Sequence, residues 1–273
     1  MPFTYSRRSA QTVHRYDTLA GITGNENISQ ETWLFAAPHD DDVAIGGGLW
    51  LKAACEAGVE VHLLVATDGR MGYCSLEQRD SITAIREAEL YNSCARLGLT
   101  DRDKIHLLGF ADCNLGQYLG RRPAEEGDPQ VAGYTGLQNA FVQKLRAIRP
   151  TRLFMPSPMD YHPDHQVVYN EMQISLFHAA GEIWPELGEP AEVPEVYDMA
   201  IYCDFPSPPT LQLRCDADQL KAKLDAIAAY RSQKQIELLV KQVSEAGPYE
   251  YLREVNFKFY SSTAYKGLFE SSA

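Results

Sequence analysis

The stretch at residues 32–68 reads TWLFAAPHDDDVAIGGGLWLKAACEAGVEVHLLVATD and contains two short apolar runs. The runs at 33–37 and 59–66 have the length and composition of buried strands. Between them, residues 49–57 have the apolar spacing of a helix that ends at Gly58. Strand, helix and strand in this order predict a βαβ unit, and hence a parallel sheet with a right-handed crossover.

The alternation of strands and helices continues along the chain. Further strands are expected at 105–110, 152–156 and 196–203, and further helices at 77–97, 137–148, 166–180 and 217–243. This order predicts an α/β fold, a single domain with a mostly parallel, Rossmann-like central sheet flanked by helices. We expect this domain at residues 31–245, after an N-terminal arm at 1–30 and before an aromatic C-terminal tail at 246–273 that packs on it.

The composition is that of a soluble globular protein, with 45% hydrophobic and 23% charged residues. A formal net charge of -12 argues against nucleic acid or an anionic membrane as partner, because both bind basic patches. We expect neither a signal peptide nor a membrane span, because the first residues lack an apolar core and no apolar stretch approaches the length of a span. The six cysteines form no C-x-x-C pair and suit a reduced, cytoplasmic protein. We therefore expect a small-molecule substrate, and the proline-rich insertions and the N-terminal arm would suit contacts in a homo-oligomer.

Two polar segments follow apolar strands at points where a helix is expected next. The first is HDDD at residues 39–42, and the second is SPMDYHPDH at residues 157–165. Functional residues of open α/β sheets gather at the carboxyl ends of the strands, so a parallel sheet would bring both segments to one edge. Together they supply His39, Asp41, Asp42, His162, Asp164 and His165.

These side chains have the chemistry of a metal site. Two imidazoles and one carboxylate form an open zinc shell whose fourth position is left to water, and the metal lowers the pKa of that water. A spare carboxylate can accept its proton, and a spare histidine can stabilise an oxyanion or protonate a leaving nitrogen. His162 and His165 are three residues apart, so they share one face of a helical turn. Asp41 and Asp42 are neighbours, so in a regular turn one can bind the metal while the other faces the water.

Each segment also has an interpretation without chemistry. An aspartate run can simply cap the helix that follows it. A lone H-x-x-H is more often a surface or packing feature than a ligand pair. Two such segments at strand-to-helix junctions of one chain nevertheless favour a metal site. The ligand types alone do not distinguish zinc from iron or another divalent metal.

At these residues the chain resembles the PIG-L/LmbE-like family of zinc-dependent N-acetylglucosaminyl-type deacetylases. The family motif His-Pro-Asp-Asp-Glu is similar to residues 39–43, and His-Pro-Asp-His matches residues 162–165 without change. Asp40 stands in place of the proline and Val43 in place of the glutamate. Asp40 adds a third carboxylate, and Val43 removes a group that could support a metal ligand.

The resemblance implies roles for individual residues. His39, Asp42 and His165 would bind one zinc ion (Zn2+) per chain. Asp41 would act as general base, and His162 would steady the tetrahedral oxyanion or act as acid. Likenesses at residues 85–99 and 109–116 add two candidate substrate-binding residues, Arg86 and Asp112. A further likeness, at residues 229–233, is to a late helix of the family with a Ser-Gln pair.

These implied roles leave alternatives open. Arg86 could instead form a helix-surface salt bridge with Glu89 or Asp80, and Asp112 could simply form a turn. The resemblance implies a hydrolase that removes an acetyl group from an N-acetylated small molecule, an N-acetylglucosamine-type sugar or a conjugate of one. A two-metal phosphoesterase and a non-catalytic sugar-binding protein on the same fold are the alternative functions.

Overall fold

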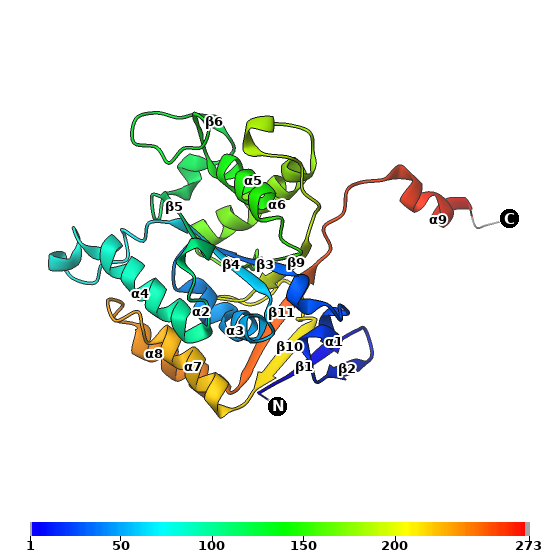
Figure 1. The fold of residues 1–273 in the computed structure, drawn as a ribbon, viewed down its shortest axis with the longest axis horizontal. Helices are drawn as coiled ribbons and strands as arrows, with labels where there is room; N and C mark the ends of the chain where they lie inside the picture. The colour runs from blue at the N-terminus through cyan, green and yellow to red at the C-terminus, as the bar shows by residue number, and fades with distance from the viewer. Residues whose placement is uncertain (1, 271–273) are drawn as a thin grey trace.

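Nine strands of the computed structural model, which describes residues 2–270, form one mixed sheet in the order β2-β1-β10-β11-β9-β8-β3-β4-β5 (Figure 1). These strands are β1 (Phe3–Arg8), β2 (Val13–Tyr16), β3 (Thr32–Ala37), β4 (Glu60–Thr67), β5 (Ile105–Phe110), β8 (Arg152–Pro156), β9 (Glu195–Met199), β10 (Leu211–Cys215) and β11 (Tyr249–Val255). Two shorter strands, β6 (Arg122–Pro123) and β7 (Tyr134–Thr135), pair within the insertion at 116–136.

Helices cover both faces of this sheet (Figure 1). They are α1 (Leu19–Thr23), α2 (Asp42–Gly46), α3 (Gly48–Glu56), α4 (Ile82–Leu97), α5 (Leu137–Ile148), α6 (Pro163–Ala180), α7 (Ala217–Ile227), α8 (Ile236–Ala246) and α9 (Lys266–Glu270). In the described part of the chain, no helix combines the length and the apolar character that crossing a membrane requires.

The central strand β3 explains how the core is divided. Its side chains alternate between two buried clusters, with Trp33 and Phe35 in one and Leu34 and Ala36 in the other. The first cluster includes residues of α3, α4 and α7, and the second includes residues of α5 and α6. A strand that is covered on both faces has to be apolar along its whole length, which is the pattern that predicts it.

The sheet is mixed rather than mostly parallel. Strands β9, β8, β3, β4 and β5 are parallel, whereas β2, β1, β10 and β11 pair antiparallel with their neighbours. The prediction therefore describes one half of the sheet. In the other half, β10 alternates buried and more exposed residues, as antiparallel strands do. This alternation covers only five residues, and the sequence prediction did not include the strand. The N-terminal segment at 1–30 was expected to be an arm, but its residues 3–8 and 13–16 form the strands β1 and β2 of the sheet.

The helix expected at 217–243 is interrupted between α7 and α8. Ser232 turns inward, and its backbone N–H and hydroxyl donate hydrogen bonds to Glu89 of α4 at 2.8 and 2.7 Å. The buried Tyr230 donates its hydroxyl to the backbone carbonyl of Asp40 at 2.6 Å. These bonds hold the chain in a turn, which competes with continuation of the helix.

The C-terminal segment has two parts. Residues 249–255 form β11, which lies between β10 and β9. Residues 258–270 are exposed, and α9 extends away from the body of the molecule (Figure 1). Residues 271–273 of the predicted tail lie outside the described residues.

Candidate active site

Both polar segments emerge from the same edge of the sheet. Strands β3 and β8 are parallel neighbours with Phe35 opposite Phe154, so the residues that follow them start side by side. His39 Nδ1 lies 3.2 Å from His165 Nε2, although 126 positions separate the two residues. The predicted convergence of the two segments is therefore confirmed.

His39, Asp42 and His165 form a compact buried cluster. The carboxylate oxygens of Asp42 lie 3.2 Å from His39 Nδ1 and 3.3 Å from His165 Nε2. Donor atoms around a tetrahedral zinc ion lie about 3.3 Å apart, so these spacings fit one metal ion. Asp42 is fully buried, and its Oδ1 makes no hydrogen bond within the described residues. A buried carboxylate oxygen without a donor is what a bound cation would satisfy.

The second nitrogen of each imidazole faces a carboxylate. His39 Nε2 lies 3.2 Å from Asp112 Oδ1, and His165 Nδ1 lies 3.1 Å from Asp160 Oδ2. These are ion-pair distances without hydrogen-bond geometry. Metal-binding histidines usually have a carboxylate beside their outer nitrogen, where it can fix the tautomer and the ring orientation. Asp160 was not among the predicted site residues, although it stands two positions before His162 within the second polar segment.

Other groupings of potential ligands share His39. Donor atoms of His39, His162 and His165 lie within 4.8 Å of one another, as do those of His39, Asp112 and Asp164. Asp164, however, accepts backbone hydrogen bonds from Cys113 at 2.8 Å and Leu115 at 3.3 Å. Asp42 accepts the backbone N–H of His39 at 2.8 Å through Oδ2 only, and its Oδ1 has no hydrogen bond within the described residues. We therefore favour the cluster of His39, Asp42 and His165.

The cluster perturbs the titration of its members. Burial lowers the pKa of each imidazole, but the surrounding carboxylates together prevail. Asp42, Asp112 and Asp164 raise the pKa of His39, and Asp42 and Asp160 raise the pKa of His165 to about 9. Burial raises the pKa of Asp42, but the two imidazoles prevail and hold it well below its usual range. Burial lowers the pKa of His162, and the neighbouring His39 and His165 lower it further, which favours neutral His162.

Asp41 lies at the N-cap position of α2 but makes no capping hydrogen bond, so the capping interpretation fails for its side chain. Arg86 of α4 donates from Nη2 to Asp41 Oδ1 at 3.3 Å. Arg86 also donates from Nε to Asp40 Oδ2 at 3.0 Å, and a second, short bond joins Nη2 to Asp40. Its ion pairs are thus with Asp40 and Asp41 rather than with Glu89 or Asp80.

The carboxyl of Asp40 is strongly influenced by this arrangement. Burial raises the pKa of Asp40, the guanidinium of Arg86 opposes that rise, and the neighbouring Asp41 adds to it. Burial lowers the pKa of Arg86, but Asp41 and Asp40 raise it above its usual value. The guanidinium of Arg86 therefore forms ion pairs with two carboxylates next to the cavity.

A cavity of about 250 Å³ lies over these residues. It is lined by His39, Asp41, Met71, Gly72, Arg86, Asp112, Cys113, His162, Tyr202, Gln233 and Gln235. Asp112, predicted to contact substrate, lines this cavity while its carboxylate contacts His39 and the backbone N–H of Met71. Gln233, which donates to the carbonyl of Gly72 at 2.8 Å, belongs to the segment at 229–233 that resembles the family but was not predicted as a site residue. Tyr202 was not predicted either. Tyr202 carries no motif that could have identified it.

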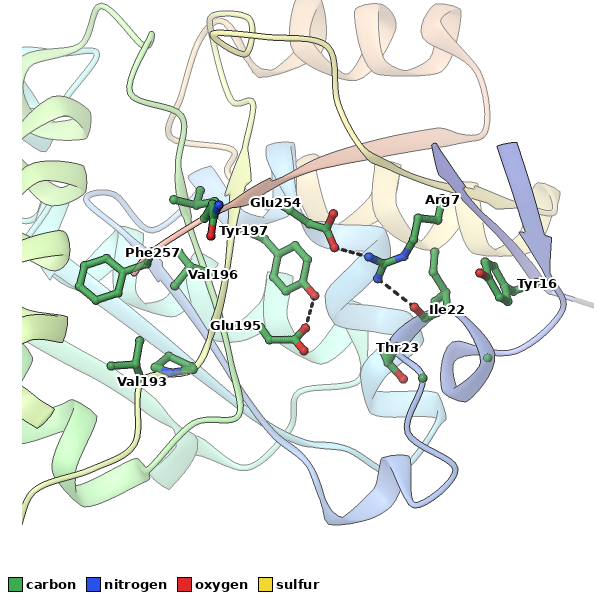
Figure 2. Close-up of a pocket in the computed structure, with 15 residues that line it drawn as sticks. Arg7, Tyr16, Ile22, Thr23, Val193, Glu195, Val196, Tyr197, Glu254 and Phe257 are labelled. Carbon is green, nitrogen blue, oxygen red and sulfur yellow. Dashed lines mark hydrogen bonds and ion pairs between the residues drawn. The ribbon is translucent and has the colours of Figure 1, made fainter. Parts of the chain in front are cut away.

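A larger cavity, of about 760 Å³, lies at the opposite edge of the sheet, beside the start of β9 (Figure 2). Figure 2 shows that its charged groups bond to one another: Arg7 contacts Glu254 and the carbonyl of Ile22, and Tyr197 contacts Glu195. Among the described residues that line this cavity there is no histidine or cysteine. The volume of a cavity therefore does not identify the candidate active site here. The smaller cavity is the one that contains histidines and aspartates suited to catalysis.

An α/β domain with a buried His–Asp cluster and a further carboxylate in the same cavity has the groups of a metal-assisted hydrolase. The chain belongs to the PIG-L family: the family model, GlcNAc-PI de-N-acetylase, matches residues 34–174. This match includes both polar segments.

Individual relatives agree with this assignment. Diacetylchitobiose deacetylase of Thermococcus kodakarensis is 32% identical over 137 residues, which are 49% of this chain and 44% of that protein. The 1D-myo-inositol 2-acetamido-2-deoxy-alpha-D-glucopyranoside deacetylase of Rhodococcus jostii is 27% identical over 183 residues, 62% of this chain and 61% of that protein. The matches therefore span less than two thirds of the length of these curated relatives.

A solved structure shows the same fold. The N,N'-diacetylchitobiose deacetylase from Pyrococcus horikoshii superimposes with a TM-score of 0.64, over 93% of this chain and 99% of that chain. The two sequences are 23% identical, so this likeness concerns the fold.

Proposed function

We propose that this protein is a metal-dependent N-deacetylase that releases acetate from an N-acetylated small molecule, an N-acetylglucosamine-type sugar or a conjugate of one. The observation that carries the proposal is the buried cluster of His39, Asp42 and His165, with Asp41 free of any capping bond in the same cavity. The names of the relatives, which act on diacetylchitobiose and on an acetamido-glucose inositol conjugate, support the substrate class.

His39, Asp42 and His165 would hold the metal, zinc or another divalent ion. When bound, it supplies Lewis acidity toward the amide carbonyl and a water of lowered pKa. Asp41 lies within the cavity and accepts the proton of the attacking water as the new C–O bond forms. Arg86 donates to Asp41 at 3.3 Å and thereby orients the carboxylate.

His162 is suited to stabilise the oxyanion that develops on the amide carbonyl. Its Nδ1 accepts a hydrogen bond from the backbone N–H of Asp164 at 3.3 Å, so in the neutral ring the proton resides on Nε2. His162 can then donate from Nε2 to the developing oxyanion. As the C–N bond breaks, the leaving nitrogen takes up the proton that Asp41 received from the water, which restores the Asp41 carboxylate and gives acetic acid and a free amine, present as acetate and an ammonium group at neutral pH.

The test combines elemental analysis with acetate release from a panel of N-acetyl sugars. One metal ion per chain and acetate release are expected, whereas two metal ions per chain would favour the phosphoesterase alternative. A metal-loaded protein that binds these sugars without releasing acetate would be a sugar-binding protein instead.

The role of Asp41 has its own test. Asp41→Asn should lower kcat by about 100-fold or more because the general base is lost, while the metal content stays unchanged. Asp80→Asn, on an exposed loop, is the matched control and should leave both unaltered. If Asp41→Asn retained most of the activity, another group would have to be the base.

A further inference from the structure

We propose that Asp40 sets the substrate class of this cavity: by balancing the charge of Arg86, it adapts the site to uncharged acetamido sugars and disfavours sugars with a phosphate or carboxylate. The inference rests on the proposed deacetylase function. It concerns the one position of the first polar segment where this chain has a carboxylate and the family motif has proline.

The charge distribution around the cavity carries the argument. Among the described residues that line it, Arg86 is the only lysine or arginine. Its side chain is 6% exposed, and its guanidinium forms ion pairs with two carboxylates, those of Asp40 and Asp41. Asp112 adds a further carboxylate to the lining. A substrate anion would therefore meet no unbalanced arginine or lysine.

An anionic group near Arg86 would also be repelled. It would have to compete with Asp40 for the guanidinium or remain beside two carboxylates in a poorly solvated site, where like charges repel strongly. A neutral hydroxyl or carbonyl oxygen does not carry this cost. The expected selection is therefore by charge rather than by size.

Arg86 retains one donor for such a neutral oxygen. Its Nε and Nη2 bond to the aspartates, whereas Nη1 has no hydrogen-bond partner within residues 2–270. A Cβ added to Gly72 would lie 2.5 Å from Nη1, so any larger residue there would crowd this nitrogen. Glycine at position 72 keeps space beside the donor.

Asp40 is held in place from a second direction. Its backbone carbonyl accepts the hydrogen bond from the buried hydroxyl of Tyr230 at 2.6 Å. Tyr230 belongs to the turn between α7 and α8, so that turn fixes the backbone from which Asp40 reaches Arg86. Proline at this position would have no carboxylate, and Arg86 would then keep only the contact of Nη2 with Asp41, so its Nε would have no carboxylate partner.

The test compares neutral and phosphorylated substrates. We would measure kcat/KM of the metal-loaded enzyme for N-acetylglucosamine and for its 1-phosphate and 6-phosphate. Wild type should prefer the neutral sugar, and Asp40→Asn should shift the ratio toward a phosphorylated sugar by about 10-fold or more, because an arginine–phosphate contact becomes available. The double variant Asp40→Asn/Arg86→Gln should lose this gain.

A matched control removes a carboxylate from an arginine at the other edge of the sheet. Glu254→Gln releases Arg7 in the cavity of Figure 2 and should leave the ratio unchanged. Calorimetric binding of glucosamine and of the corresponding glucosamine phosphates provides a readout without turnover. If Asp40→Asn does not fold, Asp40→Pro, which carries the residue of the family motif, replaces it.

The possible failures can be distinguished. Efficient use of the phosphorylated sugars by wild type, or an unchanged ratio in a folded Asp40 variant, would overturn the role of Asp40. If no acetamido sugar releases acetate, the proposed function is wrong, and the binding measurements still decide whether Asp40 controls the charge preference of the cavity.

Discussion

Replacing Asp160 by asparagine tests whether His165 is a metal ligand supported by a carboxylate. Asp160 is buried, and its Oδ2 lies 3.1 Å from His165 Nδ1 and accepts the N–H of Tyr202 at 3.1 Å. Its Oδ1 accepts the N–H of His162 at 3.1 Å. Asparagine keeps one acceptor oxygen, so it can preserve the bond to His162 but presents an NH2 group to His165 and Tyr202.

The expected effect is a weaker metal site in a folded protein. Loss of a carboxylate behind a metal-bound histidine typically lowers metal affinity about 10–100-fold. This range corresponds to about 1.4–2.7 kcal/mol of binding free energy. Zinc affinity would be measured by competition with a chromophoric chelator, and thermal unfolding would verify that the variant is folded.

Asp204→Asn provides the matched control. Asp204 is exposed in a neighbouring loop, and its carboxylate accepts only the N–H of Phe205 among the described residues, a bond that asparagine can keep. Its zinc affinity should equal that of wild type. If Asp160→Asn also bound zinc within twofold of wild type, the reasoning that assigns His165 to the metal through Asp160 would be refuted.

Three further perturbations address the metal and the scaffold. Removing the metal with a chelator should lower the thermal unfolding midpoint, because an ion at 100 times its Kd stabilises the fold by about 2.7 kcal/mol; identical midpoints with and without zinc would contradict the metal site. Arg146→Met should lower the free energy of unfolding by about 3–5 kcal/mol in urea titrations, because Arg146 donates to six backbone carbonyls at the end of α6 and in the loop that follows; the exposed Arg149→Met is the control. Burial raises the pKa of Glu31, but hydrogen bonds from Arg152, Trp33 and Asn25 prevail and lower it below 4.5, so the stability it contributes is lost as pH falls below that value. Glu31→Gln should therefore flatten the acid branch of stability against pH, and an unchanged branch would contradict the assignment.

The parallel half of the fold could be predicted because its signals are local. The apolar run of β3 and the periodic pattern of α5, expected at 137–148 and observed as Leu137–Ile148, depend on neighbouring residues alone. Strands β1 and β10 were missed because their stability depends on pairing between residues far apart in the chain, such as Phe3 and Cys215. The helix break was missed for a similar reason, since Glu89 lies 143 positions from Ser232.

The candidate site likewise contains residues that could be predicted from local sequence and contacts that could not. His39, Asp42, His162 and His165 could be identified because their spacing within two short segments carries a chemical pattern. The partners that orient them could not, because contacts such as Asp112 with His39 arise only when loops from different strands meet. The engagement of Arg86 by Asp40 was also hidden, since α4 and the first polar segment are brought together by the tertiary fold.

The pairing of β1 with β10 has a consequence for how the protein is made. Phe3 lies opposite Cys215 in this ladder, so β1, which is synthesised long before β10, has to wait for residues 211–215 before it can complete its pairing. The strands that carry both histidine segments, β3 and β8, are synthesised earlier and are already neighbours of one another. Nascent chains that stop before β10 therefore contain both halves of the cluster while β1 still lacks one of its two partners.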